Sequence, residues 1–474
     1  AGYLAAAPLP VSAQVTPFMQ AVAEGAAEKR EIAEFYRNTM YQPIWTGDTP
    51  EAKARRQALL SAIDRAGDHN LPVGRYLETL RAANLRGITT ERELGRAEVA
   101  LSELFLTYAK HVSSGILIPN RVDDEIRREV PVRDGTELLN GIATTEPVAF
   151  IRSLAPQTTE YARLQKAKIQ LETLMADGGW GPRVQAGSLR PGDSGQAVVQ
   201  LRNRLIRMGY LERSVSASYD LEMQKAVQAF QINHGIEPDG IAGGATMREI
   251  NVQVEERLPS IIVAMERERW LGVDRGDRHV LVNLTDFTAA IIDDGEERFR
   301  TRSVIGANDS ARRTYEFSDT MEYMELNPYW NLPRSISVPQ YISAMIASGG
   351  AAAGHMELID GRGNVVSRSQ VNWGAYSPVN FPYDVRQPPG PGNALGRVKY
   401  MFPNSHAIYL HDTPAKSLFS QDVRMFSHGC IRLNDPFEFG YVLLERQVEN
   451  PKEYFHSVLD TWQNTQIDLE TPIP

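Results

Sequence analysis

The spacing of apolar residues changes along this 474-residue chain, and the change predicts two kinds of structure. In the first half apolar residues recur every three or four positions, as in Leu101, Leu104, Phe105 and Tyr108, which predicts amphipathic helices. Val280, Val282 and Leu284 recur at every second position and begin a series of short runs, which is typical of strands. We therefore predict a multi-domain α+β protein with a helical first part and a β-rich second part.

A chain of this length is too long for one ordinary hydrophobic core, so we expect about three domains. Glycine and proline break the helical period between Ala176 and Gly187, which marks a junction. The predicted parts are a flexible N-terminus (1–15), a helical scaffold domain (16–180), a small three-helix domain (188–252), a connecting helix (253–271), a β-rich domain (272–450) and a C-terminal segment (451–474). A long stretch rich in glycine and proline, about 334–396, predicts a lid or capping insertion in the β-rich domain.

The net charge of -9 and the pI near 5.6 argue against a nucleic-acid partner, which requires a basic surface. Local basic clusters such as Arg312-Arg313 are interpreted as solvated surface. No apolar run is long enough to span a bilayer. Ala1 to Pro10 lack a starting Met and a basic region, so we expect a trimmed end rather than an intact signal peptide; a membrane anchor would need an uncleaved segment before it.

Cys430 is the single cysteine of the chain, and its neighbours indicate catalysis. A thiol has a pKa of about 8.5 and becomes a good nucleophile only beside a base and local donors. Cys430 follows Ser427, His428 and Gly429, and His411 lies nineteen positions upstream. The alternative is a buried cysteine that packs as a small hydrophobe, but the glycine and the two histidines favour a nucleophile.

The segment that ends at His411 is predicted to be a strand, and side-chain alternation along it predicts on which face each histidine lies. Tyr409 and His411 share one face, while His406 lies on the other. A loop after His411 can return the thiol to this strand, so we predict that His411 is the base. The backbone N–H groups of Gly429 and Cys430 are predicted oxyanion donors, each such donor being worth about 3 kcal/mol of barrier.

Two families resemble these segments. His411, fifteen intervening residues and then Ser427-His428-Gly429-Cys430 match the signature of the L,D-transpeptidase (YkuD) family, supported by Asn327–Pro333, Gly390–Gly396 and Tyr409–Pro414. Leu189–Gly195, Met208–Leu211, Ala226–Gln231 and Asp239–Ile241 are similar to the small three-helix peptidoglycan-binding domain, with Gly244 where that family usually has proline. Together with the helical part, the chain resembles the long, multi-domain L,D-transpeptidases of Gram-negative bacteria, the YcbB type.

This resemblance implies acyl transfer in the cell wall. Cys430 would attack the diaminopimelate carbonyl of a tetrapeptide stem, release D-alanine, and pass the acyl group to a second diaminopimelate amine as a 3→3 cross-link. It also implies a periplasmic location, a role in cell-wall biogenesis and cell shape, no cofactor, and acylation by carbapenems. His411 would serve as base, the Asp412 backbone carbonyl would orient its ring, and Tyr409 and Ser427 would line the site.

Other interpretations remain open at this point. His428 fits a structural hydrogen bond better than a second base, Arg432 fits either a substrate carboxylate or a neighbouring acid, and Trp330 and Trp373 fit substrate stacking less well than packing. The acceptor could instead be the amine of an outer-membrane or other cell-wall protein, or water. A zinc hydrolase lacks a complete ligand set in this sequence, and a spacer or non-catalytic wall-binding module would leave the Cys430 and His411 pair unused.

Overall fold

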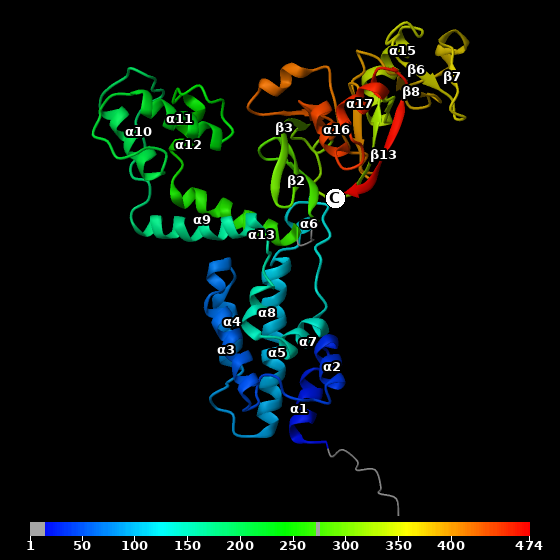
Figure 1. The fold of residues 1–474 in the computed structure, drawn as a ribbon. Coiled ribbons are helices and arrows are strands. Elements are labelled where there is room, and N and C mark those ends of the chain that lie inside the picture. Colours follow the sequence, from blue (N-terminus) through cyan, green and yellow to red (C-terminus); the bar gives the residue numbers. More distant parts are fainter. Residues whose placement is uncertain (1–14, 272–274) are drawn as a thin grey trace, which may run out of the picture. The chain divides into compact units, whose positions relative to one another are not determined.

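The computed structural model describes residues 15–271 and 275–474 (Figure 1). The predicted flexible N-terminus, 1–15, lies outside the described residues except for Val15. Two compact units are present. The first comprises Arg128–Phe230 and the described residues of 1–124 and 238–273, and the second comprises Glu125–Arg127, Gln231–Glu237 and the described residues of 274–474.

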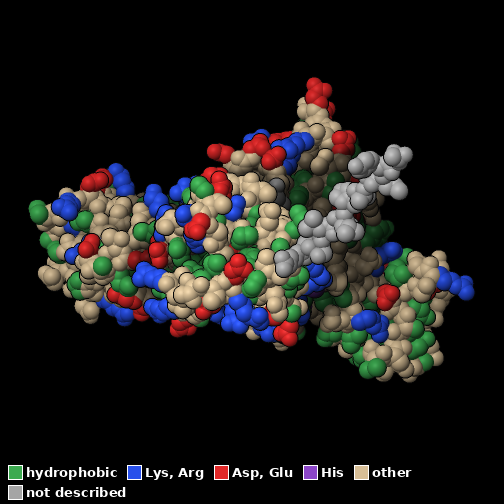
Figure 2. Space-filling view, turned by 90° about the horizontal axis from the view of Figure 1, so that it is seen from below, with side chains coloured by type: hydrophobic (Ala, Val, Ile, Leu, Met, Phe, Trp, Pro, Cys, Tyr) green, Lys and Arg blue, Asp and Glu red, His purple; other side chains and the backbone are tan. Residues whose placement is uncertain are grey.

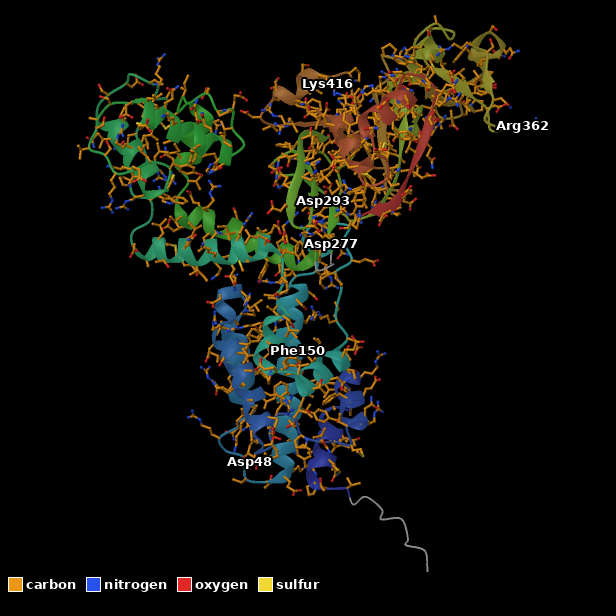
Figure 3. The ribbon with its side chains drawn as sticks, in the orientation of Figure 1. Asp48, Phe150, Asp277, Asp293, Arg362 and Lys416 are labelled. Carbon is orange, nitrogen blue, oxygen red and sulfur yellow. The ribbon has the colours of Figure 1, made fainter. Side chains whose placement is uncertain are left out.

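Helices make up the first unit, as the sequence predicts. In the scaffold they are α1 (Pro17–Gly25), α2 (Arg30–Asn38), α3 (Pro50–Asp64), α4 (Val73–Ala82), α5 (Glu91–Ser114), α6 (Pro119–Val122), α7 (Gly135–Thr144), α8 (Pro147–Arg152) and α9 (Thr159–Ala176), with a 3₁₀ turn, η1 (Ala66–His69). A capping box between Thr90 and Glu93 starts α5. The apolar face of α5 is buried, and Phe150, labelled in Figure 3, packs onto Gly141 of α7.

The buried carboxylate of Glu98 on α5 organises the loop after α2. Glu98 is 0% exposed, and its oxygens accept hydrogen bonds from the backbone N–H groups of Ile44, Trp45 and Thr46 at 2.5 to 2.9 Å. The Tyr36 hydroxyl donates to the same carboxylate at 2.8 Å. A buried charge with this many donors is satisfied, so the loop is fixed to the bundle.

The small domain is a three-helix unit, which confirms that part of the predicted fold class. Its helices are α10 (Gln196–Arg207), α11 (Leu221–Asn233) and α12 (Gly244–Ile250), followed by α13 (Val254–Leu271), which packs on α9. Val198, Leu201 and Leu205 form one buried face of α10 and meet Met247 and Ile250 of α12. The last helix of the unit begins at Gly244, the position where the resembled family has proline.

The second unit is built on a mixed β-sheet. Its strands are β1 (Arg278–Asn283), β2 (Thr288–Asp293), β3 (Glu296–Gly306), β4 (Met321–Leu326), β9 (Val398–Met401), β10 (Leu410–His411), β11 (Met425–Ser427), β12 (Ile431–Leu433) and β13 (Thr465–Ile473). They follow the order β1-β2-β3-β12-β10-β9-β4-β13, and β11 pairs with β3. The pairs β10–β12 and β11–β3 are parallel and the others antiparallel, so the β-rich prediction is confirmed.

Two features of this sheet differ from the sequence prediction. The strand expected over 407–410 begins only at Leu410, because Ala407 has φ +54 and the Asn404 side chain bonds the backbone of Ile408 in a turn. The sheet also continues past residue 450, since β13 follows α16 (Pro436–Leu444) and α17 (Pro451–Leu459) and pairs with β4. The alternation of buried Ile467 and Leu469 with exposed neighbours is the sequence signal for β13.

The predicted insertion is a folded body with its own sheet and core. It contains β5 (Trp330–Leu332), α14 (Arg334–Ser337), the π-helical turn η2 (Val338–Ile342), α15 (Ser343–Ala347), β6 (Glu357–Ile359), β7 (Val365–Val366), η3 (Arg368–Gln370), η4 (Trp373–Ala375) and β8 (Asp384–Gln387). The strands pair in the order β5-β8-β6-β7, all antiparallel. Ile342, Met345, Leu358 and Trp373 lie in a core separate from that of the main sheet.

Surface charge is mixed over the face that Figure 2 presents, where acidic and basic side chains are interspersed. Within residues 15–271 and 275–474, no helix combines the length and the apolar character that membrane crossing requires.

Candidate active site

The parallel pairing of β10 with β12 brings the two predicted catalytic residues onto neighbouring segments. Leu410 pairs with Ile431 and His411 with Arg432, and the Ile431 N–H donates to the Tyr409 carbonyl at 3.0 Å. Cys430 is the residue directly before this ladder. His411 and Cys430, nineteen positions apart in sequence, therefore lie on neighbouring bonded segments, with His411 opposite Arg432 and Cys430 beside Tyr409.

The turn that carries Cys430 depends on Gly429 and Ser427. Gly429 has φ +113, a conformation that residues with a Cβ rarely adopt. The buried Ser427 hydroxyl donates to the Cys430 carbonyl at 2.5 Å and accepts from the Gly429 N–H at 3.2 Å. The Gly429 N–H, a predicted oxyanion donor, is thus already bonded to Ser427, whereas the Cys430 N–H has no acceptor among the described residues. The Ser427 side chain therefore stabilises the turn by bonding the backbone of both Gly429 and Cys430.

The imidazole of His411 is buried and held in one tautomer. Its Nδ1 is hydrogen-bonded to the Asp412 carbonyl, and because a carbonyl only accepts, Nδ1 carries the proton and Nε2 keeps its lone pair. Burial and then the Arg432 charge lower the pKa of His411 to about 3, against the raising effect of the Asp412 and Leu395 carbonyls. His411 is therefore expected to be neutral near neutral pH.

The thiol of Cys430 is half-buried and faces Tyr409. Its Sγ donates to the Ala407 carbonyl at 3.6 Å, and the Tyr409 phenol is hydrogen-bonded to it. Burial raises the pKa of the Cys430 thiol, although the Tyr409 bonds and the charges of Arg432 and Lys399 oppose this shift. The directions of both pKa shifts therefore favour a neutral thiol and a neutral imidazole at rest.

Arg432 brings an unpaired positive charge to this pair. Within the described residues its guanidinium makes no hydrogen bond or ion pair, and its Nε is fully buried without a partner. Burial lowers the pKa of Arg432, but an arginine stays charged under ordinary conditions. The alternative of a structural tie to a neighbouring acid is not realised here, so the donors of Arg432 remain available to a ligand.

The carboxylate of Asp412 is committed to the loops around the site. Its Oδ2 accepts from the Arg397 N–H at 2.9 Å, and its Oδ1 accepts from the Lys416 ammonium at 2.9 Å; Figure 3 labels Lys416. A Cβ at Gly396 would lie 2.2 Å from Oδ2, so the approach requires glycine. Asp412 thus serves the site through its backbone carbonyl and its structural carboxylate.

Three other predicted residues lie toward the insertion. The exposed His428 accepts a hydrogen bond at its Nε2 from the Gln340 side chain of η2 at 3.2 Å. Trp373 is 9% exposed, donates to the Arg368 carbonyl at 3.0 Å and stacks on Phe381, so it packs in the insertion core. Trp330 is half-buried, and its ring meets that of Tyr341 edge-on at 6.4 Å.

His406 and His411 have different ring partners, although residues 406–409 form a turn and not the strand from which we predicted their separation. The Tyr409 and His411 rings lie 5.7 Å apart, whereas the His406 ring packs against Tyr315 and Phe317 at 5.0 and 5.1 Å. Across residues 15–271 and 275–474, no group of three or more His, Cys, Asp or Glu side chains is arranged to hold a metal ion.

We did not predict Thr314, which supports the nucleophile turn. Thr314 is 5% exposed, and its Oγ1 accepts from the Gly306 N–H at 2.9 Å and donates to the Gly429 carbonyl at 2.8 Å. It follows Arg312 and Arg313, which we interpreted as solvated surface. Both arginines are partly exposed, and each also forms an ion pair, Arg312 with Asp309 and Arg313 with Glu125.

The fold and the site together define a class of protein: a β-rich domain in which a cysteine and an oriented histidine lie on neighbouring segments. Residues 277–461 match the YkuD family, described as "L,D-transpeptidase catalytic domain", residues 194–250 match a "Putative peptidoglycan binding domain", and residues 30–167 match a "Scaffold domain". The chain therefore carries a YkuD L,D-transpeptidase catalytic domain together with a peptidoglycan-binding domain.

Two known proteins are similar to parts of the chain. A Haemophilus influenzae protein named "Putative L,D-transpeptidase" is 31% identical over 184 residues, which cover 39% of this chain and 37% of that protein. The chain thus matches little more than a third of that relative's length. The crystal structure of an L,D-transpeptidase (residues 123–326) from Xylanimonas cellulosilytica is 15% identical and covers 61% of this chain and 98% of its own. Its TM-score of 0.16 is too low to bear on the fold.

The ionisation of the Cys430 and His411 pair predicts the pH dependence of alkylation. Iodoacetamide reacts with the thiolate, so the rate at the single cysteine should keep rising with pH beyond the ordinary thiol pKa, without a plateau in the acid range. Because His411 is already neutral, His411→Ala should leave this profile nearly unchanged. Intact-protein mass spectrometry measures the rate. A plateau near pH 5 to 6 that disappears in His411→Ala would instead establish a thiolate–imidazolium pair.

The hydrogen bond from Thr314 to Gly429 predicts a role in positioning the thiol. Thr314→Val keeps the shape of the side chain but removes the hydroxyl that donates to the Gly429 carbonyl. Because the turn that carries Cys430 would then shift, acylation of the Cys430 thiol should slow by roughly ten- to a hundredfold. Thr314→Ser keeps the hydroxyl and should stay close to wild type. The acylation rate, with the melting temperature of each variant as control, measures the effect. Equal rates in Thr314→Val and wild type would contradict the role.

Proposed function

We propose that this protein is an L,D-transpeptidase that acts on peptidoglycan stem peptides through an acyl-enzyme on Cys430. The observation that supports the proposal is the pairing of β10 with β12, which brings the segment of His411, with its Nδ1 bonded to the Asp412 carbonyl, next to the segment of Cys430. The match of residues 277–461 to the catalytic domain family supports the reaction class. The activity belongs in the cell envelope, where peptidoglycan lies.

The acylation step follows from the protonation states at rest. As Cys430 Sγ attacks the carbonyl carbon of diaminopimelate in a tetrapeptide stem, its proton passes to His411 Nε2. The carbonyl oxygen becomes an oxyanion that the Cys430 N–H, free of other acceptors, stabilises. The protonated His411 then gives its proton to the leaving nitrogen, D-alanine departs, and a thioester remains.

The second step reverses these roles with a new nucleophile. An amine on a second stem attacks the thioester carbonyl, and His411 Nε2 takes the proton that the amine loses. The thiolate leaves and is reprotonated, and a diaminopimelate amine as acceptor gives a 3→3 cross-link. The amine of an outer-membrane protein, or water, would complete the same chemistry with a different product.

Arg432 couples substrate binding to the strength of the base. Diaminopimelate bears a carboxylate beside its amine, and an unpaired guanidinium next to the thiol is suited to bind such a group in two parallel hydrogen bonds. The Arg432 charge also lowers the pKa of His411. A carboxylate bound to Arg432 would offset that charge, so the imidazole would become a better proton acceptor when substrate is present.

The product formed from a purified disaccharide tetrapeptide tests the proposed function. Wild-type protein should release D-alanine and form cross-linked dimer, while Cys430→Ala should lose activity by more than a thousandfold and keep its fold. Mass spectrometry of the products distinguishes dimer from tripeptide, the product of transfer to water. Turnover in Cys430→Ala, or no D-alanine release by wild type, would overturn the proposal.

Charge at Arg432 should affect substrate affinity and rate together. Arg432→Gln removes the charge, so KM for the tetrapeptide should rise by roughly tenfold or more and kcat should also fall. Arg432→Lys restores the charge without the planar fork and should recover part of the affinity. A stem whose diaminopimelate carboxylate is amidated is the control. If wild type uses the amidated and the free stem equally well, Arg432 does not bind that carboxylate.

A further inference from the structure

Three residues of the scaffold sequence, Glu125–Arg127, belong to the second compact unit. They lie within the 30–167 match to the scaffold family and outside the 277–461 match to the catalytic domain. Ile126, which is 6% exposed, forms a parallel β-bridge with Glu316. The Arg127 N–H donates to the Glu316 carbonyl at 2.8 Å, and the Glu316 N–H donates to the Glu125 carbonyl at 3.2 Å. This segment, the strap, is therefore bonded through its backbone to the unit that carries Cys430.

The side chains of the strap hold the residues on both sides of Thr314. Glu125 forms an ion pair with Arg313, and its side chain is 14% exposed, so solvent screens this pair less than a surface pair. The guanidinium of Arg127 lies over the Tyr315 ring, 5.4 Å from the ring centroid, where the face of the ring attracts a cation. Thr314 is thus fixed through both of its neighbours in the chain.

The segment around Thr314 in turn supports the nucleophile turn. The Thr314 hydroxyl donates to the Gly429 carbonyl at 2.8 Å, and the Ala307 N–H donates to the Ser427 carbonyl at 3.0 Å. The backbone is also in close approach, because a Cβ built at Gly429 would lie 3.8 Å from the Arg313 carbonyl oxygen. The turn that carries Cys430 therefore rests on residues that the strap holds from the other side.

A second set of contacts leads from the strap to the acceptor of the thiol. The Tyr315 ring, which carries the Arg127 guanidinium on its face, meets the His406 ring edge-on at 5.0 Å. His406 directly precedes Ala407, whose carbonyl accepts from Cys430 Sγ at 3.6 Å. The strap is therefore linked to both backbone segments that contact Cys430, although it contacts neither the thiol nor the base.

The segment that the strap holds has little regular structure of its own. Residues 307–320 join β3 to β4 and contain no helix or strand. A long irregular segment samples many conformations unless contacts from elsewhere in the chain fix it. The β-bridge at Glu316 supplies such a contact in the middle of this segment. We therefore expect the position of Thr314 to depend on the strap.

We propose that the strap, Glu125–Arg127, positions the Cys430 turn for acyl transfer by fixing residues 313–316. Its side chains are positioning residues, because they act through Thr314 and contact no reacting atom. The proposal rests on the proposed function for the reaction whose rate the strap sets. It makes a piece of the scaffold sequence a working part of the catalytic unit, so the 277–461 match alone does not contain the complete support of the nucleophile.

Steady-state release of D-alanine from the disaccharide tetrapeptide by the full chain tests the strap. Glu125→Ala combined with Arg127→Ala removes both side-chain contacts and leaves the backbone bridge in place. Because a displaced nucleophile slows the chemistry and not the binding, kcat should fall by about tenfold while KM stays within about twofold. Arg127→Lys with Glu125 intact keeps a cation near the Tyr315 ring and should stay close to wild type.

Asp293→Asn is the matched control for a general loss of stability. Asp293 ends β2, is labelled in Figure 3, and pairs with Arg278 of β1; its side chain is 19% exposed, close to the 14% of Glu125. This variant should lower the melting temperature by a similar amount and keep the kcat of the wild type. An equal fall of kcat in Asp293→Asn would overturn the positioning role.

Two further readouts decide whether the strap acts through Thr314. When the strap substitutions are combined with Thr314→Val, the fall in kcat should be smaller than the product of the separate effects; a fall equal to that product would overturn the proposal. Amide hydrogen exchange at Gly306, Ala307 and Gly429, whose N–H groups are bonded in this region, should be faster in the strap variant, and unchanged exchange would also overturn it. Because exchange needs no turnover, a wild type that releases no D-alanine would count against the proposed function alone.

Discussion

The parallel contact between β10 and β12 is the feature on which the geometry of the candidate site depends. Each strand is short, but β9 pairs with β10 on one side and β3 with β12 on the other, so neither can shift. Leu410 and Ile431 are 2% and 4% exposed and belong to the main core. Because side chains alternate along a strand, burial of these two residues places His411 and Cys430 together on the other side of the ladder.

Burial determines the protonation states of the site residues, and it also destabilises the fold where a charged group is desolvated without a partner. A buried imidazole and a half-buried thiol both favour their neutral forms, so the site holds a proton ready for transfer instead of a preformed ion pair. Lys399 has its charge balanced by Glu325 at 2.9 Å, whereas Arg432 has no such partner among the described residues. An unpaired charge costs stability where it is desolvated. The unpaired guanidinium therefore supports the proposal that Arg432 binds a substrate carboxylate.

Sequence could identify the residues of the site better than their partners. The spacing of His411 and Cys430 depends on local pattern, and the pairing of β10 with β12 brings their segments together. The Tyr409 and His411 rings are also close, although the strand alternation from which we expected this does not extend before Leu410. The bonds of Thr314 and the close approach of Gly396 to Asp412 depend on contacts between distant segments, for which a single sequence holds no signal. The Ser427 hydroxyl accepts a hydrogen bond from the Gly429 N–H because the chain turns tightly there, and the spacing of residues in the sequence did not predict this turn.

The insertion adds a second folded body to the catalytic sheet, and this bears on the acceptor. In the proposed function the sheet supplies the thiol, the base and the oxyanion donor, and these three groups do not distinguish one acceptor amine from another. Contact between the two bodies at the nucleophile turn runs through Gln340 and His428. Gln340 lies on the π-helical turn η2, an irregularity that is frequent at functional sites. We infer that side chains of the insertion, held in place by its own core, select the acceptor.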